Sequence, residues 1–403
     1  MKPTVLVVTT ARWLPTARMA VALAKAGFSV ESVCPAGHPI AKTTAVKHPF
    51  LYRGVAPLKS IVAAIAATNP DLLVCGDDLA VKHLHSLYEQ DTRAGKSGKS
   101  ICELIERSIG RPENFAVIDD RASFMQVAQE AGVRVPETAA IGDHENLDQW
   151  IAQIGFPTVL KANGTWGGVG VRIVHNTGEA RHELDRLQGA PHPSRAVKRF
   201  IFDRDSTLLR PSILRHKTGI NAQSFIAGTE ATSAVACWRG QVLAGLHFEV
   251  LQEAHPGGPS TVLRRIAHPE MSAAVEKMVR RLQLSGLHGF DFMLDREFRH
   301  AYLIEINPRI TQVDHLNFGA SQDLAGALFA ALSGLEPSSS TAITENDIIT
   351  LFPKEWLRDP ESAYLRSGYH DVPWDQPELV RAYVRKPDGQ SKRKLARRDR
   401  PNR

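Results

Sequence analysis

The amino-acid sequence predicts an α/β protein: an open parallel sheet first, a two-part α+β module next, and a small C-terminal extension. Three observations support this fold class. Apolar runs alternate with helical runs up to about residue 113, a pattern typical of parallel strands joined by crossover helices. A glycine-rich loop lies between two strand-like runs near residue 165. Two further strand-like runs near residue 300 carry acidic residues within apolar sequence.

The N-terminal region is expected to form βαβ units. Its first crossover, residues 9–16, has no G-x-G-x-x-G pattern, so the predicted sheet does not imply dinucleotide binding. Asp77 and Asp78 follow the third strand, at the edge where open sheets bind ligands. They can contact a substrate, but capping of the next helix is the favoured interpretation. The expected elements are strands at 4–8, 28–34 and 71–75 and helices at 15–26, 58–67 and 79–88.

The loop KANGTWGGVG, residues 161–170, ends one strand-like run and begins another. Its glycines are Gly164, Gly167, Gly168 and Gly170. Glycines leave backbone N–H groups uncovered, so the loop can close over phosphates, while Lys161 supplies a positive charge. The β-branched residues that follow predict a hairpin and not the helix of a Walker A motif. The alternative is an ordinary glycine-rich hairpin without a ligand.

Residues 289–294 and 301–309 predict an acidic antiparallel hairpin. Pairing about the turn brings Asp291 close to the position opposite Glu305, and Asn307 shares a face with Glu305. Mg²⁺ prefers such oxygen ligands together with nucleotide phosphates, and Mn²⁺ is the second candidate ion. The alternative is a structural role in which Glu305 forms an ion pair with an arginine.

A lysine–glycine hairpin, a linking strand at 223–230 and an acidic E-x-N strand, in this order, resemble the ATP-grasp superfamily over roughly residues 113–333. The resemblance implies that Lys161 and the glycine loop hold the ATP phosphates and that Glu230 binds the ribose. It further implies that Arg309 faces the transferred phosphoryl group. The adenine hinge would comprise Gln223, Ser224, Phe225 and Ile226, and the metal ligands would be Asp291, Glu305 and Asn307.

The sequence departs from the family pattern at two positions. Arg121 stands where a second phosphate-binding lysine is common, and arginine keeps the charge with a different geometry. Gln223 stands where glutamate commonly begins the hinge. The resemblance still implies an ATP-dependent, ADP-forming carboxylate–amine ligase that works through an acyl phosphate. A small-molecule phosphotransferase and a non-catalytic nucleotide-binding protein are the alternatives.

The resemblance also implies a domain plan. Residues 1–113 would form the pre-ATP-grasp domain and 114–335 the ATP-grasp module, with subdomains at 114–222 and 223–335. Residues 336–385 would be the C-terminal extension, containing strands at 347–352 and 379–384. Neither the small carboxylic acid nor the amine leaves a readable motif. Candidate acceptor contacts are Glu249, the glycine-rich residues 254–260, Arg264 and Arg265.

Composition indicates a globular protein of a reducing compartment. Its four cysteines, Cys34, Cys75, Cys102 and Cys237, show no paired spacing, which is typical of a cytoplasmic protein. The longest apolar runs are too short to span a bilayer, so no membrane partner is expected. Much of the net charge of +6 lies in the tail Lys386–Arg403. A solvated, disordered tail is a better interpretation of this stretch than a nucleic-acid-binding element.

Overall fold

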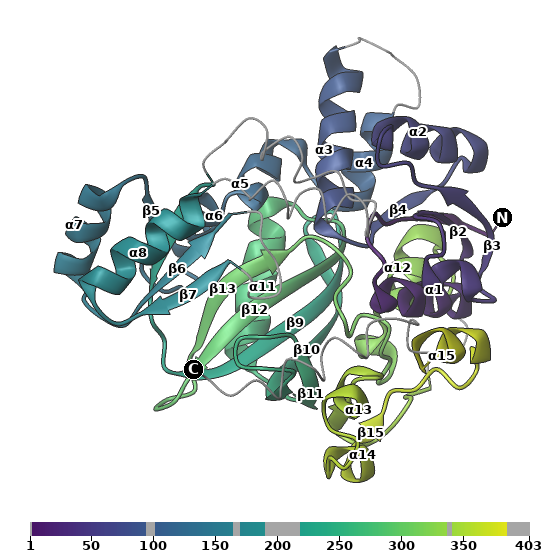
Figure 1. The fold of residues 1–403 in the computed structure, drawn as a ribbon. Coiled ribbons are helices and arrows are strands. Elements are labelled where there is room, and N and C mark those ends of the chain that lie inside the picture. Colours follow the sequence, from purple (N-terminus) through teal and green to yellow (C-terminus); the bar gives the residue numbers. More distant parts are fainter. Residues whose placement is uncertain (1, 94–100, 164–169, 190–217, 337–340, 385–403) are drawn as a thin grey trace, which may run out of the picture.

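The computed structural model describes residues 2–93, 101–163, 170–189, 218–336 and 341–384. Within these residues the strands form three sheets, of four, four and seven strands. The N-terminal sheet and the small sheet lie on opposite sides of the seven-stranded sheet (Figure 1). The predicted α/β class is confirmed. No helix in the described ranges combines the length and apolar character needed to cross a membrane.

The N-terminal sheet is parallel, with the strand order β3-β2-β1-β4. Every residue of β4 is buried, as are the last four of β1, which is expected when helices cover both faces of a parallel sheet. The sequence predicted these elements except η1, β3 and α4. The elements are β1 (Thr4–Val8), α1 (Leu14–Ala26), β2 (Ser29–Cys34), η1 (Pro39–Lys42), β3 (Val46–Leu51), α2 (Pro57–Thr68), β4 (Leu72–Cys75), α3 (Asp78–Arg93) and α4 (Ile101–Ile109).

The small sheet has the antiparallel order β5-β8-β6-β7 and carries Lys161 on β6. Helices α7 and α8 cover one face, with Leu147, Trp150 and Leu184 in the shared core. The sequence also predicts a strand at 196–201, but these residues lie outside the described ranges. The elements are η2 (Pro112–Asn114), α5 (Phe115–Asp119), α6 (Arg121–Glu130), β5 (Thr138–Ile141), α7 (His144–Ile154), β6 (Thr158–Ala162), β7 (Val171–Val174), α8 (Thr177–Gln188) and β8 (Ile220–Ser224).

The seven-stranded sheet has the order β13-β12-β9-β10-β11-β14-β15. Helix α11 packs on one face, where Phe290 and Phe292 are fully buried. Helix α12 packs against α1 of the N-terminal region, and its Phe329 forms an edge-to-face pair with Phe28, which lies between α1 and β2. The elements are β9 (Gly228–Trp238), β10 (Gln241–Glu253), β11 (Ser260–Arg265), α11 (Pro269–Leu282), β12 (Gly286–Asp295), β13 (Ala301–Asn307), η3 (Ala320–Gln322) and α12 (Leu324–Ser333).

The C-terminal extension continues the large sheet, because β14 (Ile348–Thr350) pairs with β11 and β15 (Tyr369–His370) pairs with β14. Its helices are α13 (Lys354–Arg358), α14 (Tyr364–Ser367) and α15 (Pro377–Val384). The predicted strand at 379–384 is wrong, since these residues belong to α15. A proline in the first turn starts this helix, and Leu379 packs into the main core with Val380 and Tyr383 against it.

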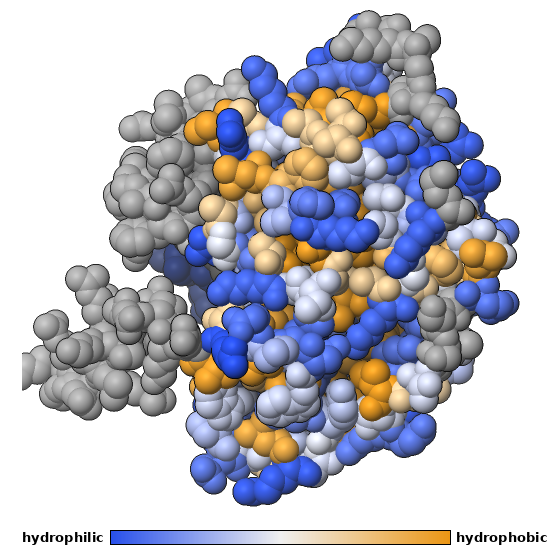
Figure 2. Space-filling view, turned by 90° about the vertical axis from the view of Figure 1, so that its right-hand side faces the viewer, coloured by the Kyte–Doolittle hydropathy of each residue, from blue (hydrophilic) through white to orange (hydrophobic). Residues whose placement is uncertain are grey.

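The extension and the N-terminal region share one exterior face of the protein. Figure 2 shows apolar and hydrophilic side chains intermixed on this face. Val55 and Trp374 are among the large apolar side chains exposed to solvent, at 83% and 76%.

A buried ion-pair network joins three distant parts of the chain. Arg18 on α1 donates to Asp371 Oδ1 at 2.5 Å and to the Asp371 carbonyl at 2.8 Å. His315, on the loop after β13, contacts Asp371 Oδ2 at 2.8 Å. The two partners hold the pKa of Asp371 below its usual value, despite the opposing effect of burial. The network therefore fixes the extension against both the N-terminal region and the loop that begins at Arg309.

We expect Asp371→Asn to lower the free energy of unfolding by about 3–5 kcal/mol, because it leaves the Arg18 charge buried beside a neutral amide. Urea unfolding measures the loss. The matched control is Asp148→Asn, which breaks the solvent-exposed pair with Arg181 and should cost little, because water and salt screen exposed ion pairs. Equal losses in the two variants would contradict a stabilising role for the buried network.

Candidate active site

Two carboxylates lie directly opposite each other on the β12–β13 hairpin. The strand register pairs Asp291 with Glu305, as the sequence predicted. Thr232 donates to Asp291 Oδ1 at 2.8 Å, and Asn307 donates to Asp291 Oδ2 at 2.8 Å. Like charges in directly opposed positions destabilise an antiparallel pair. Burial, followed by the charge of Glu305, raises the pKa of Asp291. The hairpin therefore holds negative charge in a position suited to a cation.

Arg121 bridges this hairpin to the small sheet. Its Nη2 contacts Glu305 Oε1 at 2.5 Å and its Nη1 donates to the Ala162 carbonyl at 2.6 Å. The ion pair anticipated for Glu305 is therefore present, with Arg121 as the arginine. The same contact brings Arg121 next to the strand that carries Lys161, where a phosphate-binding role was predicted. In this arrangement one guanidinium connects the two halves of the site.

Lys161 is buried among charged groups, with 6% of its surface exposed. Burial lowers the pKa of Lys161 to about 8, while the Glu305 carboxylate acts in the opposite direction. Asp291 and Glu230 also raise its pKa, and Arg121 lowers it. Burying an ammonium group is costly unless anions surround it. Lys161 thus lies in the same charged cluster as the hairpin carboxylates.

The base of the glycine loop is anchored. Ala162 N donates to the Gly170 carbonyl at 2.9 Å, which closes the hairpin as predicted. Asn163 donates to Asp120 Oδ2 at 3.1 Å and accepts from Asn221 at 2.7 Å. Gly164, Gly167 and Gly168 lie outside the described residues.

The predicted hinge connects the small sheet to the large one. Gln223 is buried in β8, and Ser224 N donates to the Glu137 carbonyl at the strand end. Phe225, 38% exposed, and Ile226 follow before β9 begins at Gly228. Near the start of β9, Glu230 keeps an exposed side chain, and partial burial together with the charges of Glu253 and Asp291 raises its pKa.

Arg309 lies two residues beyond the end of β13, beside the metal-ligand candidates. Its Nη2 donates to Asn307 Oδ1 at 3.0 Å, and its Nε lies 3.3 Å from Asp78 on the N-terminal region. The guanidinium also stacks 5.1 Å from the centre of the Trp13 ring. Asp77 accepts from Ala80 N at 3.0 Å, so the predicted helix cap is confirmed for Asp77. Asp78 instead orients Arg309.

Comparison with known proteins matches this geometry to a family. The family described as "Carbamoyl-phosphate synthase L chain, ATP binding domain" matches residues 120–317. The matched residues form an ATP-grasp domain. It is 26% identical over 208 residues to a carbamoyl phosphate synthase large chain of Kocuria rhizophila, covering 50% of this chain and 16% of the relative. The corresponding large chain of Sulfurisphaera tokodaii is 22% identical over 326 residues, covering 75% and 28%. The chain therefore spans less than a third of these relatives.

Solved structures share the ATP-grasp fold at low sequence identity. An N5-carboxyaminoimidazole synthetase from Staphylococcus aureus, complexed with ADP, has a TM-score of 0.58 at 15% identity, covering 84% of this chain and 80% of that one. The biotin carboxylase domain of 2-oxoglutarate carboxylase from Hydrogenobacter thermophilus has a TM-score of 0.58 at 16% identity, covering 84% and 71%. These likenesses extend the shared fold beyond the residues that the family match covers.

Two of the residues expected to contact the acceptor substrate, Glu249 and Arg264, lie on the face of the large sheet opposite the carboxylates. Glu249 pairs in register with Ala231 and Arg264. Thr232, the next residue along β9, contacts Asp291, and successive side chains of a strand point to opposite faces. Glu249 therefore points away from the carboxylates, and ion pairs with Arg264 and Arg299 hold it there. The expectation for Glu249 and Arg264 is wrong.

One lysine that the sequence did not mark, Lys354 of the extension, contacts the loop after Arg309. Lys354, at the start of α13, donates to Gln312 Oε1, and Gln312 donates to Ser260 Oγ. Burial lowers the pKa of Lys354 to about 8, and no described carboxylate forms an ion pair with it. A desolvated ammonium without an anion is costly. No sequence signal marks Lys354, because only the fold brings it to this loop.

Asp314 was also missed. Its Oδ2 has no partner among the described side chains, and Thr311 donates to its Oδ1. Burial raises the pKa of Asp314 to about 6, which lets it exchange a proton near neutral pH. A perturbed carboxyl five residues beyond Arg309 is a candidate general base.

Asp291→Asn should raise the melting temperature of the metal-free protein at pH 7, because a carboxyl whose pKa is raised on folding is destabilising when ionised. The gain should shrink as the pH falls toward 4, where the wild-type carboxyl becomes protonated. Asp295→Asn on the same hairpin is the matched control. Backbone N–H donors, chiefly from Phe298, lower the pKa of Asp295, so this variant should lose stability at pH 7. Changes of the same sign in both variants would contradict charge repulsion at Asp291.

Proposed function

We propose that the chain is an ATP- and Mg²⁺-dependent ligase that activates a carboxylate as an acyl phosphate for attack by an amine or another nucleophile. The observation that carries this proposal is the clustering of Asp291, Glu305, Lys161, Arg121 and Arg309 around one place. Negative ligands for a metal ion and positive groups for phosphates lie together there. Phosphoryl transfer needs this combination of charges.

The cationic side chains would bind and orient the ATP phosphates. Lys161, buried at the base of the glycine loop, supplies a point charge. Arg121 can exchange its contact with Glu305 for a phosphate once a metal ion neutralises that carboxylate. Asp291, Glu305 and Asn307 would hold Mg²⁺, which neutralises charge on the transferring phosphoryl group when bound. Within the described ranges no three His, Cys, Asp or Glu side chains form a metal site, so phosphate oxygens would complete the coordination.

The loop 309–315 would bind the carboxylate to be activated. Arg309 can align the carboxylate with the phosphoryl group through its planar fork. Lys354 and Gln312 would hold the negative charge of the acid from the side of the extension. Asp314 would then accept a proton as the nucleophile attacks the acyl carbon. A water-poor site limits hydrolysis of the acyl phosphate before that attack.

Bicarbonate is the first carboxylate to test, because the Hydrogenobacter thermophilus structure contains bicarbonate with MgADP. The decisive experiment incubates the protein with ATP, Mg²⁺, one acid and pools of amines. The proposal expects ADP and phosphate to appear only with a specific acid and amine pair. Release of AMP and pyrophosphate would contradict it. A stable phosphorylated acid, formed without any amine, would indicate a phosphotransferase.

Lys161→Ala should weaken ATP binding by about 1.5–3 kcal/mol, because it removes a charge-assisted phosphate contact. The pKa of about 8 for Lys161 also predicts that wild-type affinity falls between pH 7 and pH 9 as the ammonium loses its proton. Lys161→Arg keeps its charge and should bind ATP with a flat pH profile. Calorimetric titration at several pH values measures both effects. Identical pH profiles of ATP affinity for wild type and Lys161→Arg would show that Lys161 does not contact the phosphates.

Arg309→Ala should lower kcat by roughly 100-fold or more with little change in ATP affinity, since its charge matters most as the phosphoryl group transfers. Measuring ADP release and thermal melting on the same preparations separates catalysis from stability. The control is Asp78→Asn, which loosens Arg309 from the N-terminal region but keeps the guanidinium. Wild-type turnover in a folded Arg309→Ala protein would exclude the catalytic role.

Lys354→Met should raise KM for the carboxylate by roughly tenfold or more while leaving KM for ATP unchanged. Lys354→Arg should restore part of the affinity. Lys59→Met, at an exposed position on α2, controls for the loss of one positive charge. An equal rise in both KM values would assign Lys354 to a structural role.

A further inference from the structure

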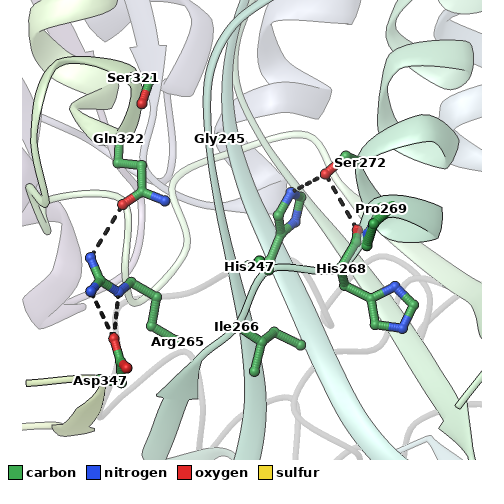
Figure 3. Close-up of a pocket in the computed structure, with 11 residues that line it drawn as sticks. Gly245, His247, Arg265, Ile266, His268, Pro269, Ser272, Ser321, Gln322 and Asp347 are labelled. Carbon is green, nitrogen blue, oxygen red and sulfur yellow. Dashed lines mark hydrogen bonds and ion pairs between the residues drawn. The ribbon is translucent and has the colours of Figure 1, made fainter.

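A second cavity lies at the edge of β10 in the large sheet, away from the carboxylates. It has a volume of about 630 Å³ and opens between β10, the start of α11 and η3. Figure 3 shows Arg265, Gln322 and Asp347 on one wall and His247, Ser272 and Pro269 on the other. We call it the β10–α11 cavity. The cavity forms because β11 covers β10 only as far as the pair Phe248 and Arg265. Residues 241–247 of β10 therefore have no strand beside them on that edge.

The two sites lie on different strands of the large sheet. Asp291 is on β12 and Arg265 is on β11, with β9 and β10 between them, a separation of about 14 Å at the usual strand spacing. The register places Arg265 on the same face as Asp291, whereas Ser233 and His247, whose side chains are in contact at 2.7 Å, are on the opposite face. The β10–α11 cavity therefore opens at an edge of the sheet away from the phosphate and metal groups.

One wall presents a fixed guanidinium. Arg265 Nε and Nη2 contact Asp347 Oδ1 at 2.9 and 2.7 Å, and Nη1 donates to Gln322 Oε1 at 3.3 Å. The guanidinium also lies 4.4 Å from the centre of the Phe318 ring. Because the Gln322 oxygen accepts from Arg265, its amide nitrogen points toward the cavity, where no described residue accepts from it (Figure 3).

The other wall presents a fixed hydroxyl. His247 Nε2 lies 2.9 Å from Ser272 Oγ. Burial, with a smaller effect from His268, lowers the pKa of His247 to about 4, so the imidazole is neutral at pH 7 and holds Ser272 in place. Apolar surface completes the lining at Ile266 and Pro269. An adjoining hollow of about 250 Å³ adds Val242, Leu243 and Val275.

We propose that the β10–α11 cavity binds a small molecule that carries a carboxylate or a phosphate on an apolar body. The donors are Arg265, the Gln322 amide and the Ser321 hydroxyl, whereas the Ser272 hydroxyl already donates to the His268 carbonyl at 3.3 Å; this set suits an acceptor-rich group. Asp347 is the single carboxylate in the 630 Å³ lining, and it is already engaged by Arg265. The volume falls in the range typical of small-molecule sites. The ligand is distinct from the ATP and metal ion of the proposed ligase, since β9 and β10 separate Arg265 on β11 from Asp291 on β12.

The test uses benzoate and phenyl phosphate as probes and benzyl alcohol as the uncharged comparison, titrated by saturation-transfer difference NMR. We expect one anionic probe to bind with saturation, the alcohol to bind more weakly, and saturating MgADP to leave the affinity unchanged. The probe that binds with the higher affinity, benzoate or phenyl phosphate, shows whether the natural ligand carries a carboxylate or a phosphate. Absence of saturable binding by both anions, or displacement by MgADP, would overturn the proposal.

Substitutions of cavity residues test whether the probes bind in the β10–α11 cavity. Gly245 lies in the lining, and an added Cβ would make only ordinary contact with Val235, at 3.5 Å. Gly245→Val should therefore fill the cavity and abolish binding without a change in fold. Arg265→Met should weaken binding roughly tenfold or more, whereas Arg281→Met, at an exposed position on α11, should have no effect. If Gly245→Val melts early, Gln322→Met tests the opposite wall. Wild-type affinity for the probe in Gly245→Val would overturn the proposal. If Gln322→Met is used instead, wild-type affinity in that variant would overturn it.

Discussion

Repulsion between two facing carboxylates organises the centre of this protein. Asp291 and Glu305 occupy opposed positions on one hairpin, and each surrounding contact offsets their charge. Thr232 and Asn307 donate to Asp291, while Arg121 pairs with Glu305. Lys161 adds a buried ammonium from another sheet. Because Arg121 and Lys161 both belong to the glycine-loop half, electrostatic attraction to the hairpin also draws the two halves of the module together.

The loop that begins at Arg309 depends on regions outside the matched residues. Ile310 N donates to the Cys75 carbonyl at the end of β4, and Arg309 itself contacts Asp78. His315 and Gln312 contact Asp371 and Lys354 of the extension. These contacts explain why the extension continues the large sheet through β14. The extension holds the reactive loop from one side while the N-terminal region holds it from the other.

Local pattern predicted the parts of the fold and site that depend on one or two neighbouring elements. The Asp291–Glu305 register followed from strand alternation about a short turn, and the helix cap at Asp77 followed from its place after a buried strand. The helix 377–384 was missed because Leu379–Val384 is a short run rich in β-branched and aromatic residues, whose period does not separate strand from helix. Glu249 was misplaced because sequence spacing does not reveal which face of a sheet a residue occupies. Lys354 and Asp371 depend on contacts between residues more than 40 positions apart, which no local pattern encodes.

The side chains of the proposed site fall into two groups, one for phosphate and metal and one for the other substrates. This division indicates which residues would select the substrates. Lys161, Arg121 and the hairpin ligands would serve phosphate and metal, which every ATP-dependent ligase of this kind shares. The groups that would meet the acid and the nucleophile come instead from the loop 309–315, the extension and the N-terminal region near Trp13 and Asp78. Changes in these regions can alter the acceptor without disturbing the charge balance around Asp291. On this proposal, the identity of the substrates would depend on side chains such as Lys354, which lies where the extension meets the loop 309–315.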